Sequence, residues 1–460
     1  MRRSSTPIRR TITGVAAAAA FACALVTAPS NAAAQPSSDR VQVEIPGPEH
    51  TGPEALAHSH AEAGSGYVWV PRTGKQTKPS RSLTPKEQQA DGTVTKVVDN
   101  GPTAYRLDIV FVGDGYTAGE LTRFHADVRA RWAEIVAVEP YRTYAGLFNV
   151  WAVDAVSRQS GVSGDPSPNA VRDTALGSYF WCNNTDRLLC VNQAKVDSYV
   201  DNAPEADLVM MLANSSMYGG AGYNTPNPRL GYDGIATSSA RHVQSGQVAI
   251  HETGHSLGKL ADEYFYPSIP GYEYYSGPEP RASNISRLTA AQMQSTRTKW
   301  YRWLGQVSPD GGRVGAYVGG GYYMTGLNRP TDGSLMRFNG KPFNLPGVEA
   351  MIAGFYRHAS AARALTPPEH PLRAGDIARI TLSQPAGTTA RPLEVRWYLD
   401  GELLRTGAAV DRVLVSELRL EAGHAQRHRL SAVVTDPTDS VRDPAIAKTL
   451  STTLTWKVLA

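Results

Sequence analysis

Apolar runs alternate with amphipathic segments through the middle of the chain. Residues 107–112, 148–153 and 207–212 form short, nearly continuous apolar runs of the kind found in buried strands. The first run ends in Gly113-Asp114-Gly115, a turn signal, and residues 120–138 follow with the apolar spacing of a helix. Strands that alternate with helices predict an α/β layer.

The glycine-rich stretch 218–223 has two readings. Its sequence Tyr-Gly-Gly-Ala-Gly-Tyr is poor in side chains for a strand interior, and it suits a sheet edge that an extended peptide approaches closely. A plain loop explains the same glycines equally well.

The pattern changes after Thr366-Pro367-Pro368. Short alternating runs at 377–380, 393–399 and 430–434 are separated by turn signals such as Asp400-Gly401. We therefore expect residues 366–460 to form a small immunoglobulin-like β-sandwich, with Trp397 near its centre.

The N-terminus has the pattern of an export signal. Four arginines, Arg2, Arg3, Arg9 and Arg10, precede an apolar core that ends in small residues at 31–34. This predicts a signal peptide over 1–34 and a secreted, extracellular protein. Residues 35–98 are rich in Pro, Ser, Gly and charge, which is typical of a linker or a propeptide. No later apolar run approaches the roughly 20 residues of a membrane span.

The charge and the cysteine content bear on which partners and which disulfides the exported protein can have. The four signal arginines account for the formal net charge of +4, so the exported chain is close to neutral and gives no reason to expect a nucleic-acid partner. Cys23 lies in the signal core. Cys182 and Cys190 remain as an even pair, which outside the cell predicts a disulfide.

The chemistry concentrates in residues 248–264, which contain the pattern His251-Glu252-Thr253-Gly254-His255. On a helix, two histidines four residues apart project from one face and can bind one Zn²⁺. Glu252 then lies beside the metal, where it can act as general base on a water. The apolar residues Val248-Ala249-Ile250 before the motif predict a buried helix, and Gly258 is expected to end it and turn the chain back toward the metal.

A catalytic zinc site needs a third protein ligand and one open position. Metzincins place that ligand three residues after the glycine, where this chain has Ala261, which cannot coordinate. Asp262 is the expected third ligand, with Glu263 or a distant carboxylate or histidine as the alternatives. Met336 follows a turn signal at 331–334, as in the Met-turn that packs beneath the metal in metzincins.

Residues 251–264 resemble the signature H-E-x-G-H-S-x-x-x-L-A-D-E-Y of the IgA peptidase family, metallopeptidase family 64. The resemblance extends to the opening segment 107–116, to Tyr218-Gly219-Gly220 and to the turn at 334–337. It implies a metzincin-like α/β (α+β) zinc peptidase domain, placed here at 99–365. It also implies ligands His251, His255 and Asp262, the catalytic Glu252, and a protein or peptide substrate.

Two other functions stay open on the sequence. The chain could be an extracellular binding protein that uses its C-terminal sandwich, or a zinc amidase that acts on cell-wall peptides. The donor that stabilises the oxyanion is also open among four tyrosines, Tyr264, Tyr266, Tyr322 and Tyr323. The sequence does not determine the oligomeric state.

Overall fold

The computed structural model describes residues 39–45, 67–74, 78–267, 270–387, 390–408, 410–420 and 427–459. The predicted signal peptide, residues 1–34, lies outside the described residues. In the part of the chain that is described, no helix combines the length and the apolar character needed to cross a membrane.

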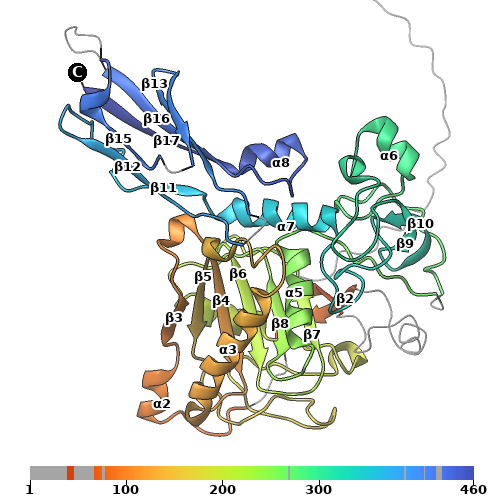
Figure 1. The fold of residues 1–460 in the computed structure, drawn as a ribbon. Helices are drawn as coiled ribbons and strands as arrows, with labels where there is room; N and C mark the ends of the chain where they lie inside the picture. Colours follow the sequence, from red (N-terminus) through yellow and green to blue (C-terminus); the bar gives the residue numbers. More distant parts are fainter. Residues whose placement is uncertain are drawn as a thin grey trace, which may run out of the picture. The chain divides into compact units, whose positions relative to one another are not determined.

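An eight-stranded mixed sheet is the centre of the α/β part, in the order β2-β1-β7-β8-β6-β4-β5-β3 (Figure 1). The neighbours β8, β6, β4 and β5 run parallel. The remaining pairs are antiparallel: β3 with β5 at one end, and β8 with β7, β7 with β1, and β1 with β2 at the other. The strands span Arg40–Glu44 (β1), Tyr67–Pro71 (β2), Val94–Val98 (β3), Leu107–Asp114 (β4), Phe148–Val153 (β5), Leu208–Ala213 (β6), Gly220–Tyr223 (β7) and Ile235–Ser239 (β8).

Both faces of this sheet are covered, which explains why its central strands are buried along their whole length and largely apolar. Alternate side chains of β4 enter two separate clusters of buried residues: Ile109 and Phe111 belong to one, Val110 and Val112 to the other. Helices α3, α5 and α7 contribute to the first cluster and α4 to the second. The helices span Pro85–Ala90 (α2), Leu121–Ile135 (α3), Gln193–Val200 (α4), Ser245–Ser256 (α5), Ala290–Thr296 (α6), Leu345–His358 (α7) and Pro444–Thr449 (α8).

The predicted α/β organisation is confirmed. The three apolar runs lie in β4, β5 and β6, and the predicted helix 120–138 corresponds to α3. The loop reading of the glycine-rich stretch is wrong, because residues 220–223 form β7. The stretch is a strand but not an edge of the sheet, since β7 lies between β8 and β1.

Residues from the range 35–98 also belong to the sheet. Strands β1 and β2 form an antiparallel pair, and β1 meets β7 where Glu44 pairs with Gly222. At the opposite edge, β3 pairs with β5. Composition alone did not predict these strands.

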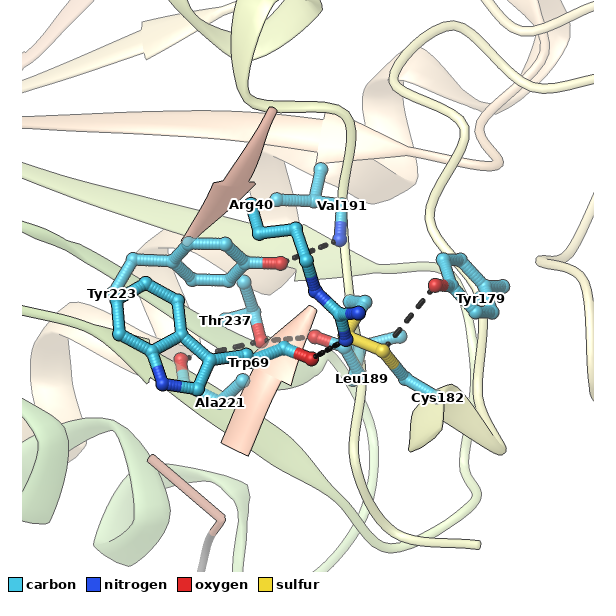
Figure 2. Close-up of a disulfide and its surroundings, with 10 residues drawn as sticks. Arg40, Trp69, Tyr179, Cys182, Leu189, Val191, Ala221, Tyr223 and Thr237 are labelled. Atoms are coloured by element: carbon cyan, nitrogen blue, oxygen red, sulfur yellow. Dashed lines mark hydrogen bonds between the residues drawn. A yellow bond between two sulfur atoms is a disulfide. The ribbon is translucent and has the colours of Figure 1, made fainter. Parts of the chain in front are cut away.

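The disulfide between Cys182 and Cys190 is present, with the two Cα atoms 5.8 Å apart, so this prediction is confirmed (Figure 2). The segment that follows it contacts both β7 and the end of β2. The Val191 amide donates to the Tyr223 hydroxyl over 2.9 Å, and the Gln193 amide donates to the Arg72 carbonyl over 3.0 Å. The bridge therefore fastens a segment that supports the β1–β2 pair.

The C-terminal part contains two small antiparallel sheets, β11-β12-β15 and β14-β13-β16-β17. Trp397 of β13 is fully buried and stacks on Trp456 of β17 with ring centroids 5.5 Å apart. A β-rich C-terminal region is thus confirmed. Its strands span Ala362–Ala364 (β11), Ile377–Leu382 (β12), Glu394–Leu399 (β13), Glu402–Gly407 (β14), Arg412–Leu414 (β15), Arg427–Thr435 (β16) and Ser451–Leu459 (β17).

A partly buried ion cluster lies at the end of α7. The His358 ring contacts Asp207 through Nδ1 at 2.8 Å and Asp233 through Nε2 at 2.9 Å. Burial opposes the charged ring, but the hydrogen bonds to Asp207 and Asp233 outweigh it and raise the pKa of His358 to about 9. The imidazolium therefore links the strand β6 region to α7 at neutral pH.

Candidate metal centre

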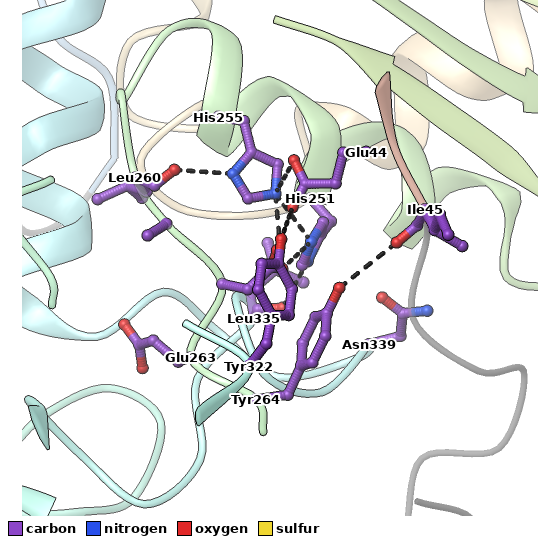
Figure 3. A network of polar contacts seen from close by, with 12 residues as sticks. Glu44, Ile45, His251, His255, Leu260, Glu263, Tyr264, Tyr322, Leu335 and Asn339 are labelled. Carbon is purple, nitrogen blue, oxygen red and sulfur yellow. Dashed lines mark hydrogen bonds and ion pairs between the residues drawn. The ribbon is translucent and has the colours of Figure 1, made fainter. Parts of the chain in front are cut away.

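Helix α5 carries the histidine motif and is buried along most of its length. His251 and His255 are one turn apart, and their rings meet with centroids 4.8 Å apart. The apolar lead-in Val248-Ala249-Ile250 packs into the protein, which explains why a helix with two polar histidines is buried. The helix therefore presents both imidazoles at one enclosed point (Figure 3).

Four side chains converge at this point: Glu44, His251, His255 and Asp262. One potential ligand atom from each lies within 4.8 Å of all the others. His251 Nε2 is 3.0 Å from Asp262 Oδ1 and 3.1 Å from His255 Nε2, and His255 Nε2 is 2.9 Å from Glu44 Oε2. Ligands at the usual 2.0 to 2.1 Å around a tetrahedral zinc are separated by roughly 3.3 Å, so this spacing fits such an ion.

The orientation of the two imidazole rings also favours a cation. His251 Nδ1 lies 3.1 Å from the Leu335 carbonyl, and His255 Nδ1 lies 2.7 Å from the Leu260 carbonyl. A carbonyl oxygen only accepts, so each Nδ1 donates, and in a neutral ring the Nε2 lone pair then faces inward. Two such lone pairs beside two buried carboxylates repel one another, and a divalent cation relieves that repulsion.

The chain reaches Asp262 through a turn after α5. The Leu260 amide donates to the Gly254 carbonyl over 3.1 Å, and Lys259 adopts the left-handed conformation with φ of 50°. The expectation that Gly258 makes this turn is therefore wrong by one residue. Gly258 is instead required by packing, because a Cβ there would lie 2.7 Å from the Met351 sulfur.

Of the two adjacent carboxylates considered as third ligand, Asp262 joins the group and Glu263 points elsewhere (Figure 3). A distant carboxylate, the other alternative, is also present in the group as Glu44. The Glu263 carboxylate is fully buried and accepts hydrogen bonds from Asn284, Ser334 and Asn344 at 2.7 to 3.0 Å. Its amide donates to the Met336 carbonyl over 2.8 Å. Glu263 thus ties the segment after α5 to the 334–337 turn and helps to aim its neighbour Asp262.

Glu252 lies next to the ligands and is completely buried. Neither of its carboxylate oxygens receives a hydrogen bond from the described residues. Burial, together with the nearby Glu44 carboxylate, raises the pKa of Glu252 to about 8. A Cβ on Gly222 of β7 would come within 2.1 Å of Glu252 Oε2, so only glycine leaves room for this carboxylate. The Glu252 carboxylate therefore lies in the space between its own helix α5 and strand β7.

Met336 is buried beneath the motif helix and is not one of the four convergent residues. Its sulfur lies 2.6 Å from the position that a Cβ on Gly254 would take. The glycine inside the motif thus allows the methionine to pack directly against the helix. The preceding residue, Leu335, supplies the carbonyl that fixes the His251 tautomer.

Among the four tyrosines considered, Tyr322 brings its hydroxyl to the carboxylates of the ligand group, whereas the Tyr264 ring stacks on His251 with centroids 6.5 Å apart. Tyr322 sits in the turn between β9 (Tyr317–Gly320) and β10 (Tyr323–Arg329) and has an unusual positive φ of 75°. Its hydroxyl is within hydrogen-bonding distance of Asp262 Oδ2 and lies 3.0 Å from Glu44 Oε1. The Tyr264 hydroxyl donates instead to the Ile45 carbonyl over 3.4 Å.

Glu44 is the site residue that sequence reasoning missed. It lies more than 200 positions before the motif, in a polar region whose composition predicted no packed structure. The only local signal was the alternation of Val41, Val43 and Ile45, which now proves to be β1. Nothing in that alternation indicated that β1 would meet β7 opposite Gly222.

Comparison with known families agrees with the site. Residues 95–310 match the family model described as IgA Peptidase M64. This region belongs to the M64 peptidase family. The match makes the protein a metallopeptidase, and a peptide is therefore its kind of substrate. No curated protein matches the chain.

Three of the four convergent residues and Glu252 lie inside the M64 region. Glu44 precedes that region, and Tyr322 and Met336 follow it. The M64 segment therefore contains the two histidines, the aspartate and the proposed base, whereas flanking segments supply the residues that surround them.

Proposed function

We propose that this M64 peptidase is a secreted zinc endopeptidase. The observation that carries the proposal is the convergence of His251, His255 and Asp262 on one buried point, with the unpaired Glu252 carboxylate beside it. Two imidazoles and a carboxylate are a common ligand set of catalytic zinc. The mixed nitrogen and oxygen donors favour zinc over magnesium or calcium, which prefer oxygen alone.

Bound at these three ligands, zinc would polarise the substrate carbonyl and lower the pKa of a water molecule toward 7. Glu252 is the proposed general base, since it is close to the ligands and its oxygens accept no hydrogen bond from described side chains or backbone. It takes the proton of the attacking water and passes it to the amine that leaves. Gly222 keeps the carboxylate in this position.

Tyr322 is the proposed donor to the oxyanion. Its hydroxyl touches carboxylate oxygens of both Glu44 and Asp262, so it already donates toward negative charge at the ligand group. A phenol in this position can donate to the oxygen that gains charge as the carbonyl is attacked. Tyr264, Tyr266 and Tyr323 are then structural, which accords with the packing of Tyr264 and Tyr266 against Tyr322.

Strand β7, which β1 pairs with only at Glu44 and Gly222 among the described residues, is the proposed binding surface for the substrate once β1 is displaced. An extended peptide can pair with a sheet edge through its backbone while its alternate side chains enter pockets. Gly222 of β7 is adjacent to Glu252, so a peptide paired there brings its backbone to the base. This arrangement favours an endopeptidase, because a strand continues past the reacting bond in both directions.

The finer structural assignments belong to the same proposal. We assign the region 99–365 to a metzincin-like catalytic domain and 366–460 to an immunoglobulin-like sandwich. A signal peptide at 1–34 and the Cys182–Cys190 disulfide both support export, because disulfides persist outside the reducing cytosol. The name of the family refers to immunoglobulin A, but we propose no particular protein substrate.

The test is hydrolysis of an unfolded protein such as casein after metal removal and zinc addition. We expect the chelated chain to be inactive and one equivalent of Zn²⁺ to restore cleavage at internal bonds, identified by mass spectrometry. Both wild type and Glu44→Ala are assayed, because Glu44 shares the ligand group. Cleavage of cell-wall peptides alone would favour the amidase, and zinc binding without any hydrolysis would favour a binding protein.

A further inference from the structure

We propose that β1 is an inhibitory segment and that the Glu44 carboxylate occupies the position at the metal that water and substrate need. The inference rests on the proposed function and concerns the regulation of the same site. It identifies Glu44 as a removable fourth ligand, distinct in role from His251, His255 and Asp262.

The first argument is the number of ligands. A catalytic zinc has three protein ligands and an open position, whereas a fourth protein ligand closes the site. Glu44 Oε2 lies 2.9 Å from His255 Nε2, at the spacing of neighbouring ligands around one ion. With Glu44 in place the group has the four donors of a closed site, although the proposed hydrolysis requires an open position for water and substrate.

The second argument is the path of β1. It runs antiparallel to β7, and their one paired position joins Glu44 to Gly222, the residue that confines Glu252. The Ile45 carbonyl next to it accepts from the Tyr264 hydroxyl. The backbone of β1 and the carboxylate of Glu44 therefore lie where an extended substrate would have to pass, between β7 and the metal ligands.

The third argument is how firmly the segment is held. Val41, Val43 and Glu44 are completely or almost completely buried, and β2 covers the other edge of β1. The Glu44 carboxylate also accepts from Asn224 Nδ2 over 3.0 Å and contacts the Tyr322 hydroxyl. Substrate cannot reach the ligand group while these contacts persist, so activation requires β1 to leave.

The experiment uses the full chain with Co²⁺ in place of zinc, and acetohydroxamate as a small probe of an open metal position. Visible absorption of the cobalt reports probe binding without any turnover. We expect Glu44→Ala to bind acetohydroxamate at least about tenfold more tightly than wild type, because the fourth position is then free. Gln42→Ala is the matched control, since Gln42 is an exposed residue of the same strand.

Equal acetohydroxamate affinity in wild type and Glu44→Ala would overturn the proposal. So would loss of cobalt from Glu44→Ala, because Glu44 would then be an obligatory ligand. Folding is checked by the melting temperature and the intact disulfide. Should the alanine variant not fold, Glu44→Gln, which keeps the shape but coordinates poorly, is titrated with the same expected and contradicting results.

Casein hydrolysis separates this inference from the proposed function. Faster cleavage by Glu44→Ala than by wild type supports both. Equal cleavage by the two chains leaves the peptidase intact and refutes the inhibitory role. Tighter probe binding without cleavage by either chain, even after limited proteolysis has removed β1, leaves the blocking role of Glu44 intact and refutes the peptidase.

Discussion

Substitution of Gly222 by alanine tests whether Glu252 must hold its place beside the metal ligands. The added Cβ would lie 2.1 Å from Glu252 Oε2, whereas ordinary contacts begin at 3.4 Å. The carboxylate must therefore move by about 1.3 Å, and a misplacement of about 1 Å can cost on the order of 100-fold in rate. Gly222 has an ordinary negative φ in β7, so the backbone tolerates alanine and the effect comes from the carboxylate.

The assay for Gly222→Ala is casein hydrolysis with zinc content measured in parallel, in both the wild-type and the Glu44→Ala chain. We expect kcat to fall by roughly 100-fold with one zinc still bound, because none of the metal ligands moves. Ala221→Gly is the control on the same strand: Ala221 is buried in the cluster on the other face of the sheet. An unchanged kcat in Gly222→Ala would refute the placement of the base, and loss of zinc would refute the claim that only Glu252 is displaced.

Three further changes test other parts of the structure. Tyr322→Phe should lower kcat about 10²-fold or more with little change in zinc affinity or KM. Steady-state kinetics of the variant measure this, and an unchanged kcat would contradict the role of Tyr322. Cys182→Ser together with Cys190→Ser should lower the free energy of unfolding by about 2 to 3 kcal/mol, as measured by urea denaturation under oxidising conditions; no loss would mean that the closed loop contributes nothing. The pKa of His358 is raised to about 9, so the folded state binds this proton more tightly than the unfolded state does. The free energy of unfolding should therefore contain roughly 3 kcal/mol below pH 6.5 that is lost as the pH rises through 9. His358→Gln should flatten that part of the stability curve, and an identical curve would refute the ion cluster.

The sequence predicted the centre of the fold because local patterns determine it. Strands β4, β5 and β6 are buried along their whole length and mostly apolar, since both faces of the sheet are covered. Such runs are recognisable without tertiary information. The glycine-rich β7 was ambiguous for a physical reason. Its glycines are required by close contacts with residues far away in the sequence, among them the Glu252 carboxylate. No local sequence pattern reveals such contacts.

The site was predictable where the sequence spacing of its residues determines their positions in space. The four-residue interval between His251 and His255 determines that they share a helix face, and Asp262 follows closely enough to return to it. The choice between Asp262 and Glu263 depended on the turn at Lys259, whose left-handed conformation has no strong sequence signal in a lysine. Glu44 depended on the register between β1 and β7, which only the folded sheet determines.

The most direct test of the zinc peptidase is the comparison of Glu252→Gln with its parent, in both the wild-type and the Glu44→Ala chain, by zinc analysis and casein hydrolysis. The amide retains the shape of the side chain but cannot take a proton from water. We predict one zinc per chain before and after the substitution, and a fall in kcat/KM of about 10²- to 10⁴-fold. A Glu252→Gln chain that keeps the parental rate, or a parent that hydrolyses casein without zinc, would contradict the account.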